Sequence, residues 1–495
     1  MITKDIVVIG TGFSGMGAAV KLLESGRTDF AILEKADDVG GTWRDNTYPG
    51  CECDIPSHMY SFSWRLNPDW SRNFSAQPEI WAYMQKVADE KGIRPYIHFG
   101  VEVTGLAWDE DRSVWTVRTS AGEDYEARIV LSGVGGLHIP NIPAIGGAET
   151  FAGPRFHSAE WDHTVDLAGK KVAVIGTGAS AIQFIPIIAE EVEHLTVFQR
   201  TPPWVLGKKD NAIHPVRQKF FDKVPGLTRA YRDAIYWGLE ARAIAFNGHL
   251  NVLPYAEKLA KANIARAIDD PELRRKLTPD YRLGCKRVLQ SNTYYPTFNR
   301  ANVDLVTDHV SEIVPDGVID AAGNKHEADV IIYGTGFHVV DAFDFLDIKG
   351  RDGMDVGEQF RKHGVETYLG MTIHGVPNLF LMLGPNTALG HNSVVFMIEQ
   401  QTKYILTMLE EMEKRGADVV EVTKQAQDEW NEEIQRLVTK GIWTQGGCTS
   451  WYLDAQGKNR TIWPKFTFQY WWETRKVVAE HFAWRSAAKK AKTAA

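Results

Sequence analysis

Two stretches of the chain are near copies of each other, and both carry the glycine spacing that forces a strand into a tight turn before a helix. The first reads DIVVIGTGFSG and the second KKVAVIGTGASA, with small residues at Gly10, Gly12 and Gly15 and at Gly176, Gly178 and Ala181. Each follows an apolar run typical of a strand and precedes a pattern of small residues typical of a helix. Two separate β-α-β units are therefore expected.

The two units differ in the residue at which their second apolar run ends. The run FAILEK ends at Glu34, and the run HLTVFQR ends at Arg200. A carboxylate at this position suits the free hydroxyls of an adenosine ribose, whereas a guanidinium suits a 2'-phosphate. The pair predicts two different nucleotides on one polypeptide, FAD in the first unit and NADPH in the second. A chain that binds both is an oxidoreductase.

Length and composition limit the number of domains and the classes of protein to which the chain can belong. At 495 residues it is too long for one core and should form two or three domains. Its formal net charge of -8 argues against a nucleic-acid partner. No apolar run is long enough to span a bilayer, and the N-terminus enters a strand too early for a signal peptide.

Cysteine usage predicts the compartment. Four cysteines are too few for a disulfide framework in a chain of this length, which favours a reducing cytoplasm. Cys51 and Cys53 have C-x-C spacing, and residues i and i+2 of an extended segment point the same way, a poor geometry for a disulfide. We interpret both as ordinary thiols and not as a redox pair. No C-x-x-C or H-E-x-x-H spacing supports a metal site.

Hydrophobic periodicity predicts an α/β fold with two Rossmann-like dinucleotide-binding domains, one for FAD and one for NADP, and a helical insertion in the second. The expected elements are strands 5–10 and 29–34 around helix 14–25, a helix near 78–92, an antiparallel meander after residue 100, a second unit at 170–200, and a long amphipathic helix at 394–413. The expected boundaries are 1–145 and 337–485 for the FAD domain, 146–204 and 284–336 for the NADP domain, 205–283 for the insertion, and 486–495 for a disordered tail.

Two longer motifs are matched residue by residue. The segment FAGPRFHSAEWD provides Phe151, Gly153, His157, Trp161 and Asp162. It resembles the fingerprint F-x-G-x-x-x-H-x-x-x-W-[PD] of the Baeyer–Villiger monooxygenases; related flavin N- and S-oxygenases usually carry Tyr or Phe in place of the tryptophan. A second signature of the same family, [AG]-G-x-W-x4-[FY]-P-G-x3-D, is matched by Gly40, Gly41, Trp43, Tyr48, Pro49, Gly50 and Asp54. The resemblance runs from the first strand to about residue 470.

Three shorter matches extend the resemblance. GCKRVLQ places Lys286 and Arg287 where the family has its Lys-Arg pair. ADVIIYGTGF resembles the strand and loop that return the chain to the FAD domain, with Asp329, Thr335 and Gly336. SWYL resembles the start of the family's mobile loop and places Trp451 at its nicotinamide-contacting position. The sequence then departs from the family, reading DAQGKNRTIWPK instead of a GANIPGK-like continuation. The resemblance therefore does not define the contacts of this loop or the residues of the substrate pocket.

The resemblance implies a reaction and its catalytic residues. NADPH would reduce the flavin, dioxygen would form a C4a-peroxyflavin, and this anion would attack a small hydrophobic ketone to give an ester or lactone. An anion beside the flavin calls for a fixed cation, and an arginine stays protonated at any working pH. Arg287 is the expected catalytic cation, and Asp54 is expected to hold it in place.

The remaining site residues are expected to bind cofactors. The FAD set is Gly10, Gly12, Gly15, Glu34, Gly41, Thr42, Trp43 and Asp54, and the NADPH set is Gly176, Gly178, Ser180, Arg200, Thr201, Lys286 and Trp451. A lone histidine is more often structural than catalytic, so His157 is assigned to linking domain position with cofactor binding and not to acid catalysis. Of the late tryptophans, most are expected to pack the C-terminal segment against the FAD domain, with Trp451 the exception.

Two alternatives stay open from the sequence. A flavin monooxygenase that oxidises amines or thioethers would share both cofactors. A non-oxygenating NADPH–flavin reductase or redox-sensing flavoprotein would share the two nucleotide units alone. The sequence names neither the ketone nor the oligomeric state.

Overall fold

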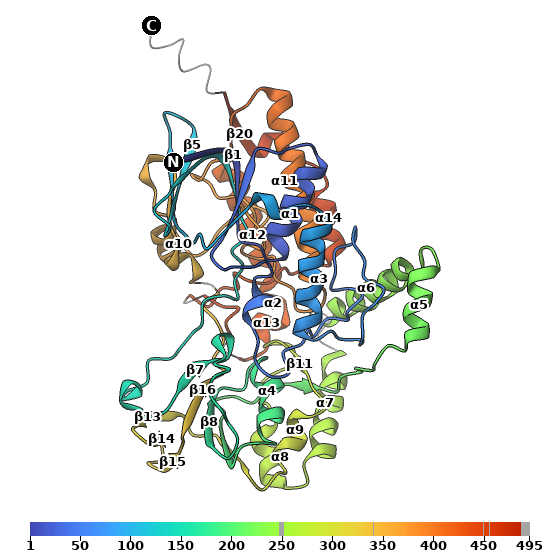
Figure 1. The fold of residues 1–495 in the computed structure, drawn as a ribbon, viewed down its shortest axis with the longest axis vertical. Coiled ribbons are helices and arrows are strands. Elements are labelled where there is room, and N and C mark those ends of the chain that lie inside the picture. Colours follow the sequence, from blue (N-terminus) through green and yellow to red (C-terminus); the bar gives the residue numbers. More distant parts are fainter. Residues whose placement is uncertain (247–251, 340, 449, 455, 487–495) are drawn as a thin grey trace.

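The two glycine-containing units form two separate sheets in the computed structural model, which describes residues 1–246, 252–339, 341–448, 450–454 and 456–486 (Figure 1). The tail predicted at 486–495 lies, apart from its first residue, outside the described residues. In Figure 1 one sheet with its helices fills the upper part of the molecule, and the other, with β7, β8, β16 and α4, fills the lower part.

The first sheet has eight strands in the order β17-β4-β5-β6-β1-β2-β3, with β18 paired to β6. Its strands are β1 (Ile2–Ile9), β2 (Phe30–Glu34), β3 (Ile97–Phe99), β4 (Val103–Asp109), β5 (Val114–Thr119), β6 (Tyr125–Ser132), β17 (Asp347–Lys349) and β18 (Leu379–Leu381). β4, β5 and β6 form the predicted antiparallel meander, and β6 returns parallel to β1. β2 is buried along its whole length, as expected of a parallel strand covered on both faces.

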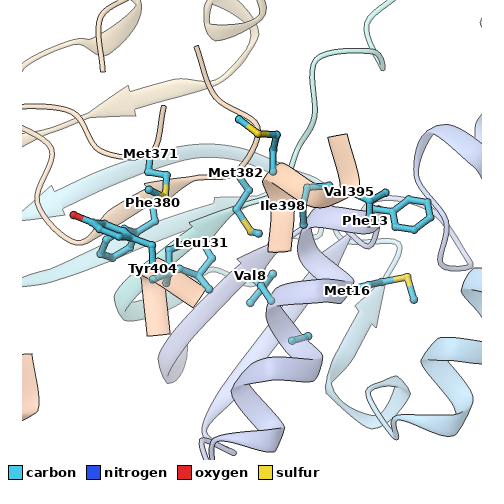
Figure 2. Packing of buried hydrophobic residues seen from close by; sticks show 14 of the residues in the cluster. Val8, Phe13, Met16, Leu131, Met371, Phe380, Met382, Val395, Ile398 and Tyr404 are labelled. Carbon is cyan, nitrogen blue, oxygen red and sulfur yellow. The ribbon is translucent and has the colours of Figure 1, made fainter. Parts of the chain in front are cut away.

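The helices of this unit cover the sheet and bury its core. α1 (Phe13–Glu24) follows β1, and α2 (Thr42–Asp45) and α3 (Gln77–Glu90) come after β2. The predicted long amphipathic helix is confirmed as α11 (Val394–Arg415). Figure 2 shows Val8, Leu131 and Phe380 packed with side chains of α1 and α11 in one apolar cluster. This core fixes the glycine turn at the end of β1 relative to α11.

The C-terminal part of the chain completes the first unit. Its remaining elements are α10 (Val356–His363), β19 (Val419–Val422), α12 (Lys424–Val438), α13 (Ile442–Gln445), α14 (Thr467–Thr474) and β20 (Phe482–Arg485). The packing prediction for the late tryptophans is correct for Trp463, which is buried in the core of the first unit. Trp443 is buried as well, but it packs against residues of the insertion and of the segment after it, such as Phe246 and Cys285. The prediction is wrong for Trp471 and Trp472, which are 44% and 56% exposed on α14 because the buried face of that helix is formed by other residues.

The second sheet is entirely parallel, in the order β12-β9-β8-β16-β7. Its strands are β7 (Arg155–His157), β8 (Lys171–Ile175), β9 (His194–Phe198), β12 (Val303–Val306) and β16 (Val330–Tyr333), and α4 (Ala181–Ile188) joins β8 to β9. A small antiparallel sheet is formed by β13 (Val310–Val314), β14 (Gly317–Asp320) and β15 (Lys325–Glu327). The chain order β8-α4-β9 is the predicted second β-α-β unit.

The segment expected to be a helical insertion is mostly helical. It contains α5 (Pro215–Lys223), α6 (Leu227–Phe246), α7 (Leu253–Ala267) and α8 (Pro271–Leu277), and α5 with α6 extends to one side of the molecule (Figure 1). One detail differs: the two-residue strand β10 (Val205–Leu206) pairs in parallel with β11 (Leu289–Gln290), and α9 (Tyr294–Thr297) follows. Strands of two residues each are too short to show a periodic pattern of apolar residues in the sequence.

The cysteines divide into two pairs with different states. Cys51 and Cys53 are free and buried, as predicted. Cys285 and Cys448 form a disulfide across a sequence separation of 163 residues. This bond was not expected, because nothing in the sequence brings two residues so far apart together. The chain therefore has one disulfide, although it has no disulfide framework.

A buried carboxylate joins the insertion to the first unit. Glu240 of α6 is 2% exposed, and its oxygens accept hydrogen bonds from His391 Nε2 at 3.2 Å, Asn392 Nδ2 at 2.7 Å and the Thr467 backbone N–H at 2.9 Å. Burial alone would raise the pKa of Glu240, but the bonds from His391 and Asn392 outweigh it and lower this pKa below its ordinary value. The carboxylate is therefore charged at neutral pH.

Replacing Glu240 by Ala is expected to lower the free energy of unfolding by about 3–5 kcal/mol, because several buried donors lose their acceptor. Because the folded-state pKa is depressed, this contribution is present above the unfolded pKa of about 4.3 and is lost as the pH falls through the folded value. Urea unfolding at pH 7 and at pH 4 measures both effects. Glu272→Ala, which removes an exposed ion pair of α8, is the matched control and should leave the free energy of unfolding nearly unchanged. Equal losses in the two variants would contradict the role of the network.

Among the described residues, no helix is both long and apolar enough to cross a bilayer. Within the same residues, no three or more His, Cys, Asp or Glu side chains gather as a set of metal ligands.

Candidate cofactor sites and the arginine between them

The first glycine turn joins β1 to α1 with the helix N-terminus left uncapped. A Cβ added to Gly15 would lie 1.9 Å from the Gly10 carbonyl oxygen, so only glycine allows this close approach. Gly12 is the N-cap residue, no side chain accepts from the first N–H groups, and the first turn carries no acidic residue. Free N–H groups and the helix dipole at this end can bind a pyrophosphate.

The segment of the second signature lies against this turn. A Cβ on Gly41 would come within 3.0 Å of Gly12 Cα, which brings Thr42 and Trp43 of α2 close to the phosphate-binding turn. Trp43 donates a hydrogen bond from Nε1 to the Tyr60 hydroxyl at 3.0 Å. The predicted FAD-binding residues Gly10, Gly12, Gly15 and Gly41 therefore form one glycine cradle that a side chain would fill, with Thr42 and Trp43 directly after it.

Glu34 occupies the end of β2 and is already well bonded within the protein. Its carboxylate accepts from the Thr11 N–H at 2.9 Å, the Thr11 hydroxyl at 2.6 Å and the Ala36 N–H at 3.0 Å. It also forms an ion pair with Arg44 Nη1 at 3.0 Å. Burial raises the pKa of Glu34, and these bonds and the Arg44 charge lower it overall, so the group stays ionised. A ribose hydroxyl would have to share this carboxylate with Arg44, a residue that the sequence analysis did not single out although it lies within the GGTWRD run.

The second glycine turn has the same design. A Cβ on Gly176 would lie 2.4 Å from the Gly334 carbonyl oxygen, and the N-terminus of α4 at Ser180 has no side-chain cap and no acidic residue in its first turn. The Ser180 hydroxyl lies 2.9 Å from that of Ser158, which follows the fingerprint histidine. The N–H groups of α4 are thus available to a second pyrophosphate, with Gly178 inside the turn.

Two cations lie together beyond the end of β9. Burial lowers the pKa of Lys286, the positive charge of Arg200 lowers it further, and the negative charge of Asp280 opposes both effects. Neither has a carboxylate within ion-pair distance in the part of the chain that the structure describes. Thr201 is linked to the same turn, because its carbonyl oxygen accepts a 3.5 Å hydrogen bond from the Thr177 hydroxyl. Two cations that form no ion pair among the described residues are suited to a phosphate.

The fingerprint segment forms the edge strand of the second sheet. A Cβ on Gly153 would lie 2.0 Å from the Asp329 carbonyl oxygen, so the close contact between β7 and the start of β16 requires glycine. His157 is fully buried, its Nδ1 accepts from the Ala159 N–H at 3.1 Å, and burial lowers its pKa to about 4. A neutral histidine held in this way cannot be an acid at neutral pH, in line with the structural role expected of it.

The other fingerprint residues are also held by local contacts. The Trp161 ring packs against Phe156 and Phe184, each at a centroid distance of 5.2 Å. Asp162 accepts from the Thr164 N–H at 2.9 Å and from its hydroxyl at 2.6 Å. Phe151 is buried in the core of the second sheet. The segment thus fixes β7 to β16 and to α4.

The strand-loop after β16 connects the two units as the resemblance implied. Thr335 donates its hydroxyl to the Asn141 carbonyl oxygen at 2.5 Å, and the Asn141 N–H donates to the Gly336 carbonyl oxygen at 2.9 Å. Asp329 accepts from the Lys171 N–H at 2.8 Å and so ties the start of β16 to β8. The segment around Asn141 and the loop after β16 therefore run side by side where the chain passes between the two units.

Arg287 and Asp54 form a bidentate ion pair between the two units. Arg287 donates from Nε at 2.9 Å and from Nη2 at 2.7 Å to Asp54 Oδ2, and from Nη2 at 2.8 Å to Oδ1. The Asp54 carboxylate raises the pKa of Arg287, which is permanently charged. The side chain of Arg287 is 38% exposed, and its Nη1 has no hydrogen-bond partner among the described residues. A fixed cation with one donor edge left free can stabilise an anion that forms beside it.

Two further side chains near this pair were missed by the sequence analysis. Tyr452 is 1% exposed; burial raises its pKa to about 12, and the Arg287 charge opposes that rise, which places the phenol close to the guanidinium. Lys208 is 6% exposed and pairs with Glu52 at 2.6 Å, two residues before Asp54. Trp451, the predicted nicotinamide contact, is 42% exposed, and its ring centroid lies 4.3 Å from that of Tyr452 with the ring planes tilted by 52°. Only Tyr452 had a sequence signal, as the neighbour of Trp451 in SWYL.

Comparisons with known proteins point to one family. Residues 3–230 match the family described as flavin-binding monooxygenase-like. A Baeyer-Villiger monooxygenase of Streptomyces coelicolor is 46% identical over 97% of this chain and 93% of its own length. A Baeyer-Villiger monooxygenase of Pseudomonas aeruginosa is 45% identical over 96% of this chain and 90% of its own. The crystal structure of cyclohexanone monooxygenase from Rhodococcus sp. Phi1 bound to NADP+ superposes with a TM-score of 0.88 at 30% identity, covering 98% of this chain and 99% of that one.

Proposed function

The chain belongs to the Baeyer–Villiger monooxygenases, and from that premise we propose that it uses FAD, NADPH and dioxygen to convert a small hydrophobic ketone to an ester or lactone. The observation that supports this most is the Arg287–Asp54 pair, in which each unit contributes one residue. A cation fixed by an ion pair that joins the two nucleotide-binding units is suited to charge stabilisation at a flavin. A reductase that only passes electrons has no need of it.

The residues around the first glycine turn are proposed to bind FAD. The N–H groups at the start of α1 would bind the pyrophosphate, and Gly41, Thr42 and Trp43 would enclose it from the facing segment. When bound and reduced, the flavin activates dioxygen for attack on the ketone carbonyl. Glu34 would accept from the ribose beside Arg44.

Arg287 is proposed to stabilise the negative charge of the reaction. Its Nη1 is free to donate toward an oxyanion, while Asp54 holds the other two nitrogens and so fixes the plane of the guanidinium. The ion pair leaves the cation fully charged across the working pH range. Because the donor is already oriented, little reorganisation is needed when the negative charge develops.

The second turn is proposed to bind NADPH. The N–H groups of α4 near Gly178 and Ser180 would bind its pyrophosphate. Arg200, Thr201 and Lys286 would bind the 2'-phosphate, and Trp451 is proposed to contact the nicotinamide. The mutual repulsion of Arg200 and Lys286 favours an anion between them, which NADH does not provide.

Asp54 is expected to be needed for the orientation of Arg287. Asp54→Ala should lower kcat for ester formation roughly 10- to 100-fold, because the guanidinium loses the partner that fixes its plane. Asp54→Asn keeps an acceptor oxygen and should lose less. Steady-state kinetics of ester formation, with the FAD content of each variant as the control, measures the effect. A wild-type kcat in Asp54→Ala would show that Arg287 is positioned by other groups.

The domain boundaries given by the sequence stay a proposal, with the first unit formed by 1–145 and 337–485, the second by 146–204 and 284–336, and the insertion by 205–283 between them. Because the chain has only four cysteines, we propose that the protein acts in the cytoplasm. The Cys285–Cys448 disulfide is an exception to the pattern expected of that compartment.

A product panel tests the proposed function against its nearest rival. The purified protein, with FAD, NADPH and air, is incubated with linear, cyclic, aryl and steroidal ketones and with thioethers and amines. We expect esters or lactones from at least one ketone class, with NADPH consumed only when flavin is bound. Oxidation of the heteroatoms alone would favour a flavin N- or S-monooxygenase. The tryptophan at position 161 argues against that rival.

A further inference from the structure

The disulfide between Cys285 and Cys448 joins two segments that both lead directly into the proposed active site. Cys285 comes immediately before Lys286 and Arg287, and Cys448 lies four residues before Tyr452. The Cα atoms are 6.1 Å apart, within the range that a disulfide spans without backbone movement. One covalent bond therefore connects the segment of the proposed catalytic arginine to the segment of the proposed nicotinamide contact.

The two segments are held in register by more than the bond. The Arg282 N–H donates to the Gly446 carbonyl oxygen at 3.0 Å, and a Cβ on Gly446 would come within 2.4 Å of Cys285 Cβ. Cys285 is 1% exposed and belongs to an apolar cluster that includes Trp443 and Tyr452. Reduction of the bond would therefore leave the two thiols close together, ready to form it again.

The two cysteine residues differ in their exposure to solvent. Cys285 is buried, whereas Cys448 is partly exposed and lies after Gly447, which has a positive φ of 75°. A reagent from solution would reach Cys448 first. The other two cysteines are buried, so Cys448 is the one cysteine of the chain that is partly exposed to solvent. A reaction with an external disulfide should therefore begin at Cys448.

We propose that Cys285 and Cys448 are a reversible thiol–disulfide site through which a low-molecular-weight disulfide such as oxidised glutathione controls exchange of the nucleotide. In the oxidation, the Cys448 thiolate attacks the external disulfide and releases one thiol. The Cys285 thiolate then attacks the mixed disulfide at Cys448 and releases the second thiol. Two protein thiols lose two electrons and two protons, and one external disulfide becomes two thiols. Reduction reverses both steps.

The bond should act on nucleotide exchange and not on the chemical step, an inference that rests on the proposed NADPH site. Lys286 directly follows Cys285, and Trp451 is three residues beyond Cys448, so the bond limits how far these two groups can separate. A nucleotide bound between them leaves only when they separate. The oxidised protein should therefore release NADP+ several-fold more slowly than the reduced protein, and kcat should fall with it where release limits turnover.

The test compares the full-length FAD-loaded protein after oxidised glutathione with the same protein after a phosphine reductant. Intact mass should show an oxidised form lighter by two hydrogen atoms, and peptide mapping should join the peptides of Cys285 and Cys448. NADP+ dissociation, followed by a chase with excess unlabelled nucleotide, should be slower in the oxidised form and recover on reduction. Cys448→Ser and Cys448→Ala should dissociate NADP+ at the reduced rate in both conditions.

Two results would overturn the inference. The first is the absence of the cross-linked peptide after oxidation, with four free thiols still titratable. The second is a cross-link that forms without changing NADP+ dissociation relative to Cys448→Ser. Because dissociation is measured without substrate, it decides the inference even if no ketone is oxidised. Failure of ester formation in both redox states would instead count against the proposed reaction.

Discussion

Arg287→Ala is expected to bind FAD and to be reduced by NADPH at close to the wild-type rate, yet to form almost no ester. Removing a preorganised charge that acts only on the developing anion should cost about 10²–10³-fold or more in product formation. NADPH should still be oxidised, with dioxygen reduced without transfer to the ketone. Simultaneous measurement of NADPH consumption and of ester by gas chromatography separates the two activities.

A matched arginine and a conservative replacement complete this test. Arg275→Ala removes an exposed guanidinium of α8 that pairs with Glu272 and should leave both rates unchanged. Arg287→Lys keeps the charge but cannot hold Asp54 with two nitrogens, so it should recover only part of the activity. Ester formation near the wild-type rate in Arg287→Ala would remove this residue from the mechanism.

Arg200→Ala is expected to raise KM for NADPH far more than KM for NADH. The loss of a charge-assisted contact to the 2'-phosphate, worth about 1.5–3 kcal/mol, corresponds to a rise of roughly 10- to 100-fold for NADPH alone. Lys286→Ala should also raise KM for NADPH, because the charge of Arg200 lowers the pKa of Lys286 and the two cations therefore act on the same region. Initial rates of nucleotide oxidation at fixed dioxygen, measured with both nucleotides, give the two KM values.

The control for this variant is a lysine of the same sheet. Lys171 of β8 pairs with Glu327 on the surface, so Lys171→Ala should change neither KM value. If Arg200→Ala raised the two KM values equally, the 2'-phosphate would have to bind elsewhere.

Much of the fold was accessible from the sequence because the period of apolar residues and the glycine turns are local signals. The glycines at 15 and 153 are required by atoms that their added Cβ would strike, and both were identified from motifs. α11 was predicted from its apolar face because a long helix shows several turns of one pattern. The pairing of Asp54 with Arg287 came only from the family resemblance, since 233 residues separate them.

What could not be predicted depends on contacts between distant segments. Nothing local in the sequence pairs Cys285 with Cys448 or brings Arg44 onto Glu34. Trp471 and Trp472 were expected to be buried because tryptophan is mostly buried, but α14 turns them to the surface. No sequence motif marks Glu240, and its buried carboxylate is bonded by donors on two later segments.

The fate of dioxygen tests the central claim most directly. The protein is given FAD, NADPH, ¹⁸O₂ and the ketone that reacts best in the product panel, and the ester or lactone is analysed by mass spectrometry. We predict one ¹⁸O atom in the product, placed as the ring or ester oxygen beside the former carbonyl carbon, with the carbonyl oxygen unlabelled. A product without ¹⁸O, or NADPH oxidation that never yields an ester with any ketone, would contradict the assignment.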